Sequence, residues 1–299
     1  MNSLGSSTKN FDARLVIGPI QVGGLLSAAL FGCLSCQSYV YFARFTNDHL
    51  ILKITVSAVI LIQLVHFVCI ISTLWTMTVS TYGDPSQLRV LPLAADLAIP
   101  LSAFTAFIVQ SFYAFRLWKL TRNVFLPILC EIISVIAQIS TLIILPNAFS
   151  MADLTTFENN RVLPIALSLI ARAVCDVITT AGMVWSLKRN RGFDIGDMTT
   201  TTTMIDRLIY WTVETGLATS LMAVIVAVLF LVLEQNFVWF GVWLMWPNVV
   251  GNSLLASLNR RLLLRETRGA SVQSCGGGGG GLNAITFRAG SIFNHKQTY

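Results

Sequence analysis

Residues 51–78 read ILKITVSAVILIQLVHFVCIISTLWTMT, a stretch of 28 residues with one lysine and no acidic residue or arginine. An α-helix rises about 1.5 Å per residue, so about 20 residues cross a hydrocarbon core of about 30 Å. Lipid offers no partner to backbone N–H and C=O groups, so a span of this length and composition is expected to be helical. The stretch therefore predicts a transmembrane helix.

Six further stretches have the same character, and together they fill most of the chain. They predict an all-α, polytopic membrane protein that forms a single bundle of seven transmembrane helices. The predicted spans are Leu15–Phe42, Ile51–Thr78, Leu91–Leu117, Val124–Leu145, Val162–Leu187, Ile205–Leu233 and Phe237–Leu258.

The overall composition agrees with a lipid environment. The 299 residues are 55% hydrophobic and 11% charged, whereas about 25% of the residues in a soluble domain are charged. The net charge of +6 does not indicate nucleic-acid binding, because the basic residues are sorted by side. Fifteen follow the first, third, fifth and seventh spans: Arg44, Lys53, Arg116, Lys119, Arg122, Lys188, Arg189, Arg191, Arg207, Arg260, Arg261, Arg265, Arg268, Arg288 and Lys296.

Only four basic residues fall on the opposite side: Lys9, Arg14, Arg89 and Arg161. Lys and Arg are enriched in cytoplasmic loops. The distribution therefore predicts that the N-terminus is outside and the C-terminus is cytoplasmic. We expect a multi-pass protein of the plasma membrane, with an endomembrane as the alternative. The lipid bilayer is its first partner.

Three regions are predicted along the chain. Residues 1–14 form a polar N-terminal segment, and residues 15–261 form the transmembrane domain. Residues 262–299 are predicted to be a disordered cytoplasmic tail, because the run Gly276–Gly281 and its polar flanks cannot form a core. In the first span, Gly24, Ala28 and Gly32 at four-residue spacing predict close helix packing, within the molecule or in a dimer.

Charged residues inside the spans are the main functional signal, because ionisable groups are costly in lipid and usually face the bundle interior. Arg172 and Asp176 lie four residues apart and are expected to pair on one helix face. Glu131, Asp176 and Glu214 are expected at similar depths. Three acids with one nearby arginine imply either that some acids are protonated or that a cation or basic ligand enters.

Polar stripes accompany these charges. At about 100° per residue, each of three sets stays on one helix face. We interpret the stripes either as interhelical hydrogen bonds or as the lining of a ligand or ion pocket. The sets are Glu131, Ser134, Gln138 and Thr141; Gln63 and His66; and Asn248, Asn252 and Asn259.

The sequence offers no recognisable catalytic or metal-binding pattern. Cys33 and Cys36 form a CxxC inside an apolar span, without further ligands at zinc-site spacing. No catalytic triad, HExxH, Walker or dinucleotide-binding motif is present. We therefore expect no enzyme activity, no catalytic residue, no metal and no cofactor.

The last three spans carry the most distinctive motifs. They contain Gly192-Phe193, Ile205-Asp206-Arg207-Leu208 and Thr215-Gly216-Leu217, and then the run 252–261, NSLLASLNRR. With these motifs the chain resembles a large fungal family of seven-helix membrane proteins, which is typical of mushroom-forming species and known only as a domain of unknown function. The family-like core covers residues of about 162–261. Its motif residues are Gly192, Phe193, Arg207, Gly216, Asn252, Ser253, Leu255 and Asn259.

The resemblance implies seven membrane helices and supplies no activity. A likeness to G-protein-coupled receptors is limited to topology, because the third span ends in Phe115-Arg116-Leu117 and lacks an acidic-Arg-aromatic triplet. Our first hypothesis is a receptor-like or sensor protein. A small ligand would bind between the fourth to seventh spans, and a cytoplasmic protein would bind the basic loops and tail. The alternatives are a small-solute or proton-linked transporter and a structural membrane protein.

The candidate ligand or ion site under these hypotheses consists of Glu131, Arg172, Asp176, Glu214, Asn248 and Asn252.

Overall fold

The computed structural model describes residues 13–80, 92–121, 124–148, 154–191, 198–232 and 238–275, and nearly all of them are helical. The prediction of an all-α fold is confirmed for these residues. The elements are α1 (Ala13–Arg44), α2 (Leu50–Trp75), the π-helical turn η1 (Thr76–Ser80), α3 (Leu93–Thr121), α4 (Phe125–Ala148), α5 (Leu154–Arg191), α6 (Met198–Val232) and α7 (Val238–Cys275).

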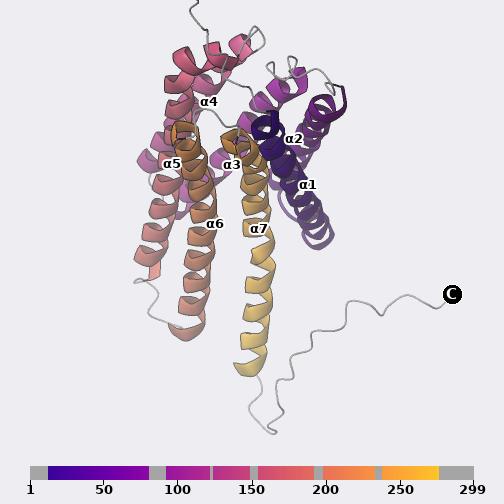
Figure 1. Ribbon diagram of the computed structural model, residues 1–299. Helices are drawn as coiled ribbons and strands as arrows, with labels where there is room; N and C mark the ends of the chain where they lie inside the picture. Colours follow the sequence, from indigo (N-terminus) through magenta and orange to yellow (C-terminus); the bar gives the residue numbers. More distant parts are fainter. Residues whose placement is uncertain are drawn as a thin grey trace, which may run out of the picture.

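The helices form a closed bundle (Figure 1). Each helix packs against the next one along the chain, and α7 packs back against α1 in the most extensive contact of the bundle. In addition to its neighbours α2 and α4, α3 contacts α5 and α7. It is therefore the interior helix around which the others are arranged.

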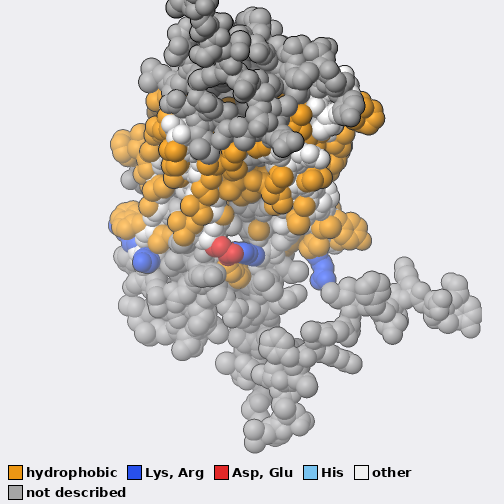
Figure 2. Space-filling view, in the orientation of Figure 1, with side chains coloured by type: hydrophobic (Ala, Val, Ile, Leu, Met, Phe, Trp, Pro, Cys, Tyr) orange, Lys and Arg blue, Asp and Glu red, His pale blue; other side chains and the backbone are white. Residues whose placement is uncertain are grey.

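Among the described residues, six segments are long and apolar enough to cross a membrane, and exposed hydrophobic side chains form the band of Figure 2. Outside these six lies α7, because Pro247, Asn248 and Asn252 interrupt its apolar run. The six are Ile17–Arg44, Leu50–Ser80, Leu93–Thr121, Phe125–Ile143, Leu167–Ser186 and Glu214–Val232.

Three helices, α5, α6 and α7, extend furthest beyond the predicted spans. Leu154 begins α5 and Arg191 ends it, while α6 already begins at Met198, so Thr199–Thr203 are helical. The last helix continues to Cys275, through residues that the composition assigned to a disordered tail. Backbone hydrogen bonding in a helix does not depend on apolar side chains, so the hydropathy pattern marks the membrane-spanning part and not the helix ends.

The main core lies between α1, α2, α3 and α7. Leu34 and Tyr41 on α1, Val59 on α2, and Leu254 and Leu255 on α7 are fully buried in it. Two of these residues belong to the family-like run 252–261, so this part of the sequence motif packs the bundle.

Glycines bring the backbones of α1 and α7 together. A Cβ atom added to Gly23 would collide with the carbonyl group of Gly241, and one added to Gly241 would collide with the carbonyl group of Pro19. Of the predicted small-residue ridge, Gly24 packs against Leu74 of α2, but a Cβ on Gly32 would meet nothing within 4 Å. The closest approach therefore uses Gly23, one position away from the ridge, and is intramolecular.

We predict that Gly23→Ala destabilises the protein by about 1–3 kcal/mol, because the new methyl group forces the α1 and α7 backbones apart. Gly32→Ala is the matched control and should change stability by less than about 0.5 kcal/mol. Thermal unfolding of the purified proteins in one detergent measures both effects. Equal melting temperatures for Gly23→Ala and the native chain would contradict the proposed close contact.

Candidate functional site

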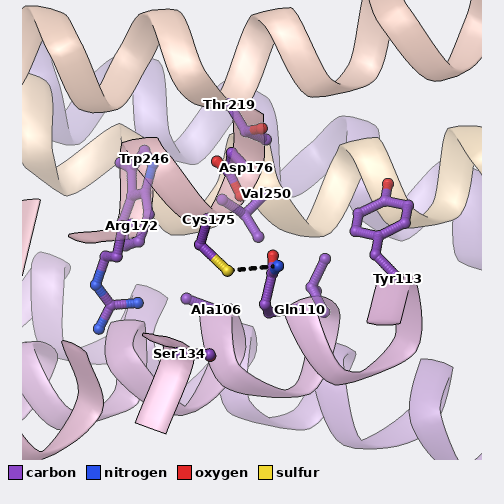
Figure 3. A pocket seen from close by; sticks show the side chains of 11 residues that line it. Ala106, Gln110, Tyr113, Ser134, Arg172, Cys175, Asp176, Thr219, Trp246 and Val250 are labelled. Atoms are coloured by element: carbon purple, nitrogen blue, oxygen red, sulfur yellow. Dashed lines mark hydrogen bonds between the residues drawn. The ribbon is translucent and has the colours of Figure 1, made fainter. Parts of the chain in front are cut away.

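A small cavity of about 30 Å³ lies between α3, α5, α6 and α7, and Ser134 of α4 closes one side (Figure 3). Since one water needs about 10–15 Å³ by this measure, the cavity holds about two waters. Its lining combines apolar side chains with one arginine and one aspartate: Ala106, Val109, Gln110, Tyr113, Ser134, Arg172, Cys175, Asp176, Thr219, Trp246 and Val250.

The helical repeat places these side chains on one face of each helix. On α3, Ala106, Val109, Gln110 and Tyr113 follow the i, i+3, i+4, i+7 spacing of a single face. The same spacing brings Arg172, Cys175 and Asp176 of α5 to the cavity. Both predicted charges of α5 therefore line the cavity.

Arg172 is held by uncharged groups of other helices. Its Nη2 donates to Oε1 of Gln138 at 3.4 Å and to Oγ1 of Thr141 at 3.3 Å, both on α4. Its guanidinium also lies 5.1 Å from the ring centroid of Trp246 on α7, at a cation–π distance. The polar stripe of α4 was thus correctly predicted to face the bundle.

The predicted ion pair between Arg172 and Asp176 is not formed. Among the described residues, no nitrogen of Arg172 lies within 4.0 Å of a carboxylate oxygen of Asp176. Figure 3 shows the guanidinium turned away from Asp176, whose carboxylate lies beside Thr219 of α6. The contacts of Arg172 with α4 and α7 replace the pairing within α5.

A hydrogen-bond network forms one wall of the cavity. Gln110 Nε2 donates to Oγ1 of Thr179 at 2.8 Å and to Sγ of Cys175 at 2.9 Å (Figure 3). The Cys175 thiol in turn lies 3.2 Å from the backbone oxygen of Cys130 on α4. The network ties α3, α4 and α5 together, and the sequence analysis did not select these residues as site residues. The one sequence feature that could have indicated this network is Gln110, a side-chain amide within the apolar run of α3.

Glu131 lies outside the cavity. Its Oε1 accepts a hydrogen bond of 2.7 Å from Ser111 of α3, and its Oε2 is buried without a hydrogen-bond partner among the described residues. Its contact with Ser111 joins α3 to α4. The expectation that Glu131 shares a site with Asp176 is therefore wrong in this structure.

Glu214 also lies apart from the cavity. Its carboxylate forms an ion pair of 2.8 Å with Arg260 of α7, and its side chain is 50% exposed. The guanidinium of Arg260 lies 5.4 Å from the ring centroid of Trp211. Sequence position gives depth along a helix but not the direction of the side chain, so three acids at similar depth do not form one cluster.

Asn248 and Asn252 bind α1 and do not line the cavity. Asn248 Nδ2 donates to Oγ of Ser27 at 2.7 Å, and Asn252 Nδ2 donates to the carbonyl oxygen of Leu30 at 3.0 Å. Gln37 Nε2 donates to Oδ1 of Asn252 at 3.0 Å. Two turns further, Asn259 Nδ2 donates to the carbonyl oxygen of Gln37 at 2.9 Å. The stripe of α7 is an interhelical hydrogen-bonding face.

The polar pair of α2 is fully buried. Gln63 Nε2 donates to the carbonyl oxygen of Pro247 at 2.8 Å and to Oγ1 of Thr105 at 3.4 Å. One turn away, His66 is buried, and neither of its ring nitrogens has a hydrogen-bond partner in the part of the chain that the structure describes. Gln63 therefore joins α2 to α3 and α7, apart from the cavity.

The remaining motif residues have packing roles where they are described. Ser253 lies 3.3 Å from the hydroxyl of Tyr113, and Leu255 is fully buried. A Cβ on Gly216 would collide with Thr180, so this glycine allows α5 and α6 to approach closely. Arg207 lies in α6, but its side chain is outside the described residues, as are Gly192 and Phe193.

Among the described residues, no three His, Cys, Asp or Glu side chains gather in a way that could hold a metal ion.

One family model matches part of the chain. Residues 172–262 match the "Family of unknown function (DUF6534)". The match begins at Arg172, includes α6 and ends within α7 at residue 262, so it contains Arg172 and Asp176 together with the run 252–261. The chain matches no curated protein and no solved structure.

We predict that Asn252→Ala lowers stability by about 1–2 kcal/mol, because it removes two side-chain hydrogen bonds to α1. Ser35→Ala is the control, since the Ser35 hydroxyl is exposed and bonds only Phe31 of its own helix. Unfolding by heat in detergent measures the difference. If the two variants unfold at the same temperature, the hydrogen bonds between α1 and α7 do not stabilise the bundle.

Proposed function

We propose that this membrane protein is a receptor-like sensor that binds a small ligand in the cavity between α3, α5, α6 and α7. The observation that carries the proposal is the lining of this cavity. It contains Arg172 and Asp176, two groups of opposite charge that do not pair with each other. Charged groups inside a membrane domain mark functional sites more often than packing sites.

We further propose that α7 is a seventh span, that the N-terminus is outside, and that the protein lies in the plasma membrane of a fungus. The Lys and Arg side chains visible in Figure 2 support the orientation, since they lie at one edge of the hydrophobic band and cytoplasmic ends are enriched in Lys and Arg. The basic side chains described at the helix ends belong to the set predicted to be cytoplasmic: Arg44, Lys53, Arg116, Lys119, Lys188, Arg189, Arg260 and Arg261.

A route from the cavity to this basic end runs along α3 and α7. Tyr113 lines the cavity, and its hydroxyl lies 3.3 Å from Oγ of Ser253. One turn further, Arg116 Nη1 donates to Oγ of Ser257 at 2.6 Å. A ligand that shifts Tyr113 would change the contact between α3 and α7. We propose that a cytoplasmic protein reads this change at the basic loops and tail.

The main rival is a small-solute or proton-linked transporter that uses Asp176. Of the three acids assigned to such a pathway, only Asp176 lines the cavity, because Glu131 and Glu214 have other partners. We also propose that the protein does not act as an enzyme, so that the ligand is released chemically unchanged. The cavity thiol of Cys175 contacts an amide, Gln110, and not a general base.

We predict that Asp176→Ala and Arg172→Gln abolish ligand-induced stabilisation and leave expression intact. The full chain in nanodiscs is screened by thermal shift against small polar metabolites. A ligand at 100 times its Kd stabilises the native protein by about 2.7 kcal/mol. Glu214→Gln is the control and should retain the shift, because Glu214 lies outside the cavity.

Two results would contradict the sensor. The first is an unchanged response in both cavity variants. The second is uptake of the ligand into liposomes that contain the purified protein under a pH gradient, which would favour the transporter.

A further inference from the structure

Arg172 has unused hydrogen-bonding capacity beside the cavity. A guanidinium carries five N–H donors in a planar fork. The bonds that Arg172 makes to described residues come from Nη2 alone, at 3.3 and 3.4 Å, and both acceptors are neutral. Its Nη1 and Nε therefore have no partner among the described residues. Each of these two nitrogens can donate a charge-assisted hydrogen bond to an oxygen of a ligand carboxylate.

Asp176 supplies the complementary charge in the same cavity. It lies four residues after Arg172, which corresponds to a rise of about 6 Å along α5. The two charged groups are more than 4.0 Å apart and face different helices. The two groups therefore do not neutralise each other, although both line the cavity.

We infer that the cavity binds a small zwitterion, an α-amino acid of the size of glycine or alanine, with its carboxylate on Arg172 and its ammonium group on Asp176. The inference rests on the proposed function and names its ligand class. A simple anion would leave Asp176 beside a second negative charge, and a simple cation would leave Arg172 unmatched. A zwitterion complements both charges at once.

Size and lining narrow the ligand further. A cavity of about 30 Å³ holds about two waters, so even glycine enters only if the lining side chains shift. Ala106, Val109 and Val250 contribute apolar surface and favour a hydrogen or methyl side chain over a polar one. Long or charged amino acids do not fit this space.

The test compares four probes of similar size on the full chain in nanodiscs: glycine, L-alanine, propionate and ethylamine. Propionate retains the carboxylate of alanine, and ethylamine retains its ammonium group. We expect calorimetric titration to show binding of glycine and L-alanine at least about tenfold tighter than either single-charge probe, because each charged hydrogen bond contributes that much or more.

Matched variants assign each end of the ligand. Arg172→Gln and Asp176→Asn should each weaken L-alanine binding at least about tenfold. Arg172→Gln should not affect ethylamine, and Asp176→Asn should not weaken propionate. Glu214→Gln should bind L-alanine like the native chain, because its carboxylate pairs with Arg260. Equal melting temperatures of the variants without ligand show that each one folds.

The outcomes separate this inference from the sensor proposal. The proposal that the cavity binds a zwitterion is wrong if propionate or ethylamine binds as tightly as L-alanine. It is also wrong if none of the four probes binds. In those cases another ligand that depends on Asp176 would leave the sensor intact. Conversely, L-alanine binding without a change in hydrogen exchange around Ser253 and Ser257 would support the amino-acid site and contradict the sensor.

Discussion

The need to satisfy the polar side chains of α7 inside the bundle is the constraint on which the structure depends. This helix carries Asn248, Asn252 and Asn259 on one face, and lipid cannot bond their amides. By pressing α7 against α1 the structure gives all three side-chain NH2 groups an acceptor, through Ser27, Leu30 and Gln37, while Oδ1 of Asn248 and Oδ1 of Asn259 stay buried without a partner among the described residues. The glycine contact at Gly23 and Gly241 allows the backbones to come close enough for these bonds.

This contact between α1 and α7, the α1–α7 seam, fixes the rotation of α7 and so determines which of its side chains face the cavity and the core. With the asparagines turned toward α1, Trp246 and Val250 face the cavity, and Leu254 and Leu255 enter the main core. Gln63 adds a further restraint through its bond to the carbonyl of Pro247. The wall of the cavity that belongs to α7 is therefore held by contacts outside the cavity, so a substitution in the α1–α7 seam is expected to disturb the cavity at a distance.

Hydropathy was sufficient to predict the helices, because length and apolar character follow directly from residues such as those of 51–78. It was also sufficient to select Arg172 and Asp176, since ionisable groups in lipid must turn inward. Hydropathy did not predict the positions of Glu131 and Glu214, which lie outside the cavity. Each found its own partner, Ser111 and Arg260, and such partners depend on the relative rotation of two helices. For the same reason Gln110, Thr219 and Trp246 were not recognised as cavity residues.

The ion pair expected between Arg172 and Asp176 on α5 is not formed, because contacts with other helices replace this local i, i+4 interaction. Opposite charges four residues apart on a helix stabilise it by only about 0.2–0.5 kcal/mol. Arg172 instead contacts Gln138 and Thr141 of α4 and Trp246 of α7, while Asp176 lies beside Thr219 of α6. Two residues of one helical turn thus contact three other helices. Any group that enters the cavity and attracts both charges must alter contacts to α4, α6 and α7 together, so occupancy of a small cavity can change the packing of half the bundle.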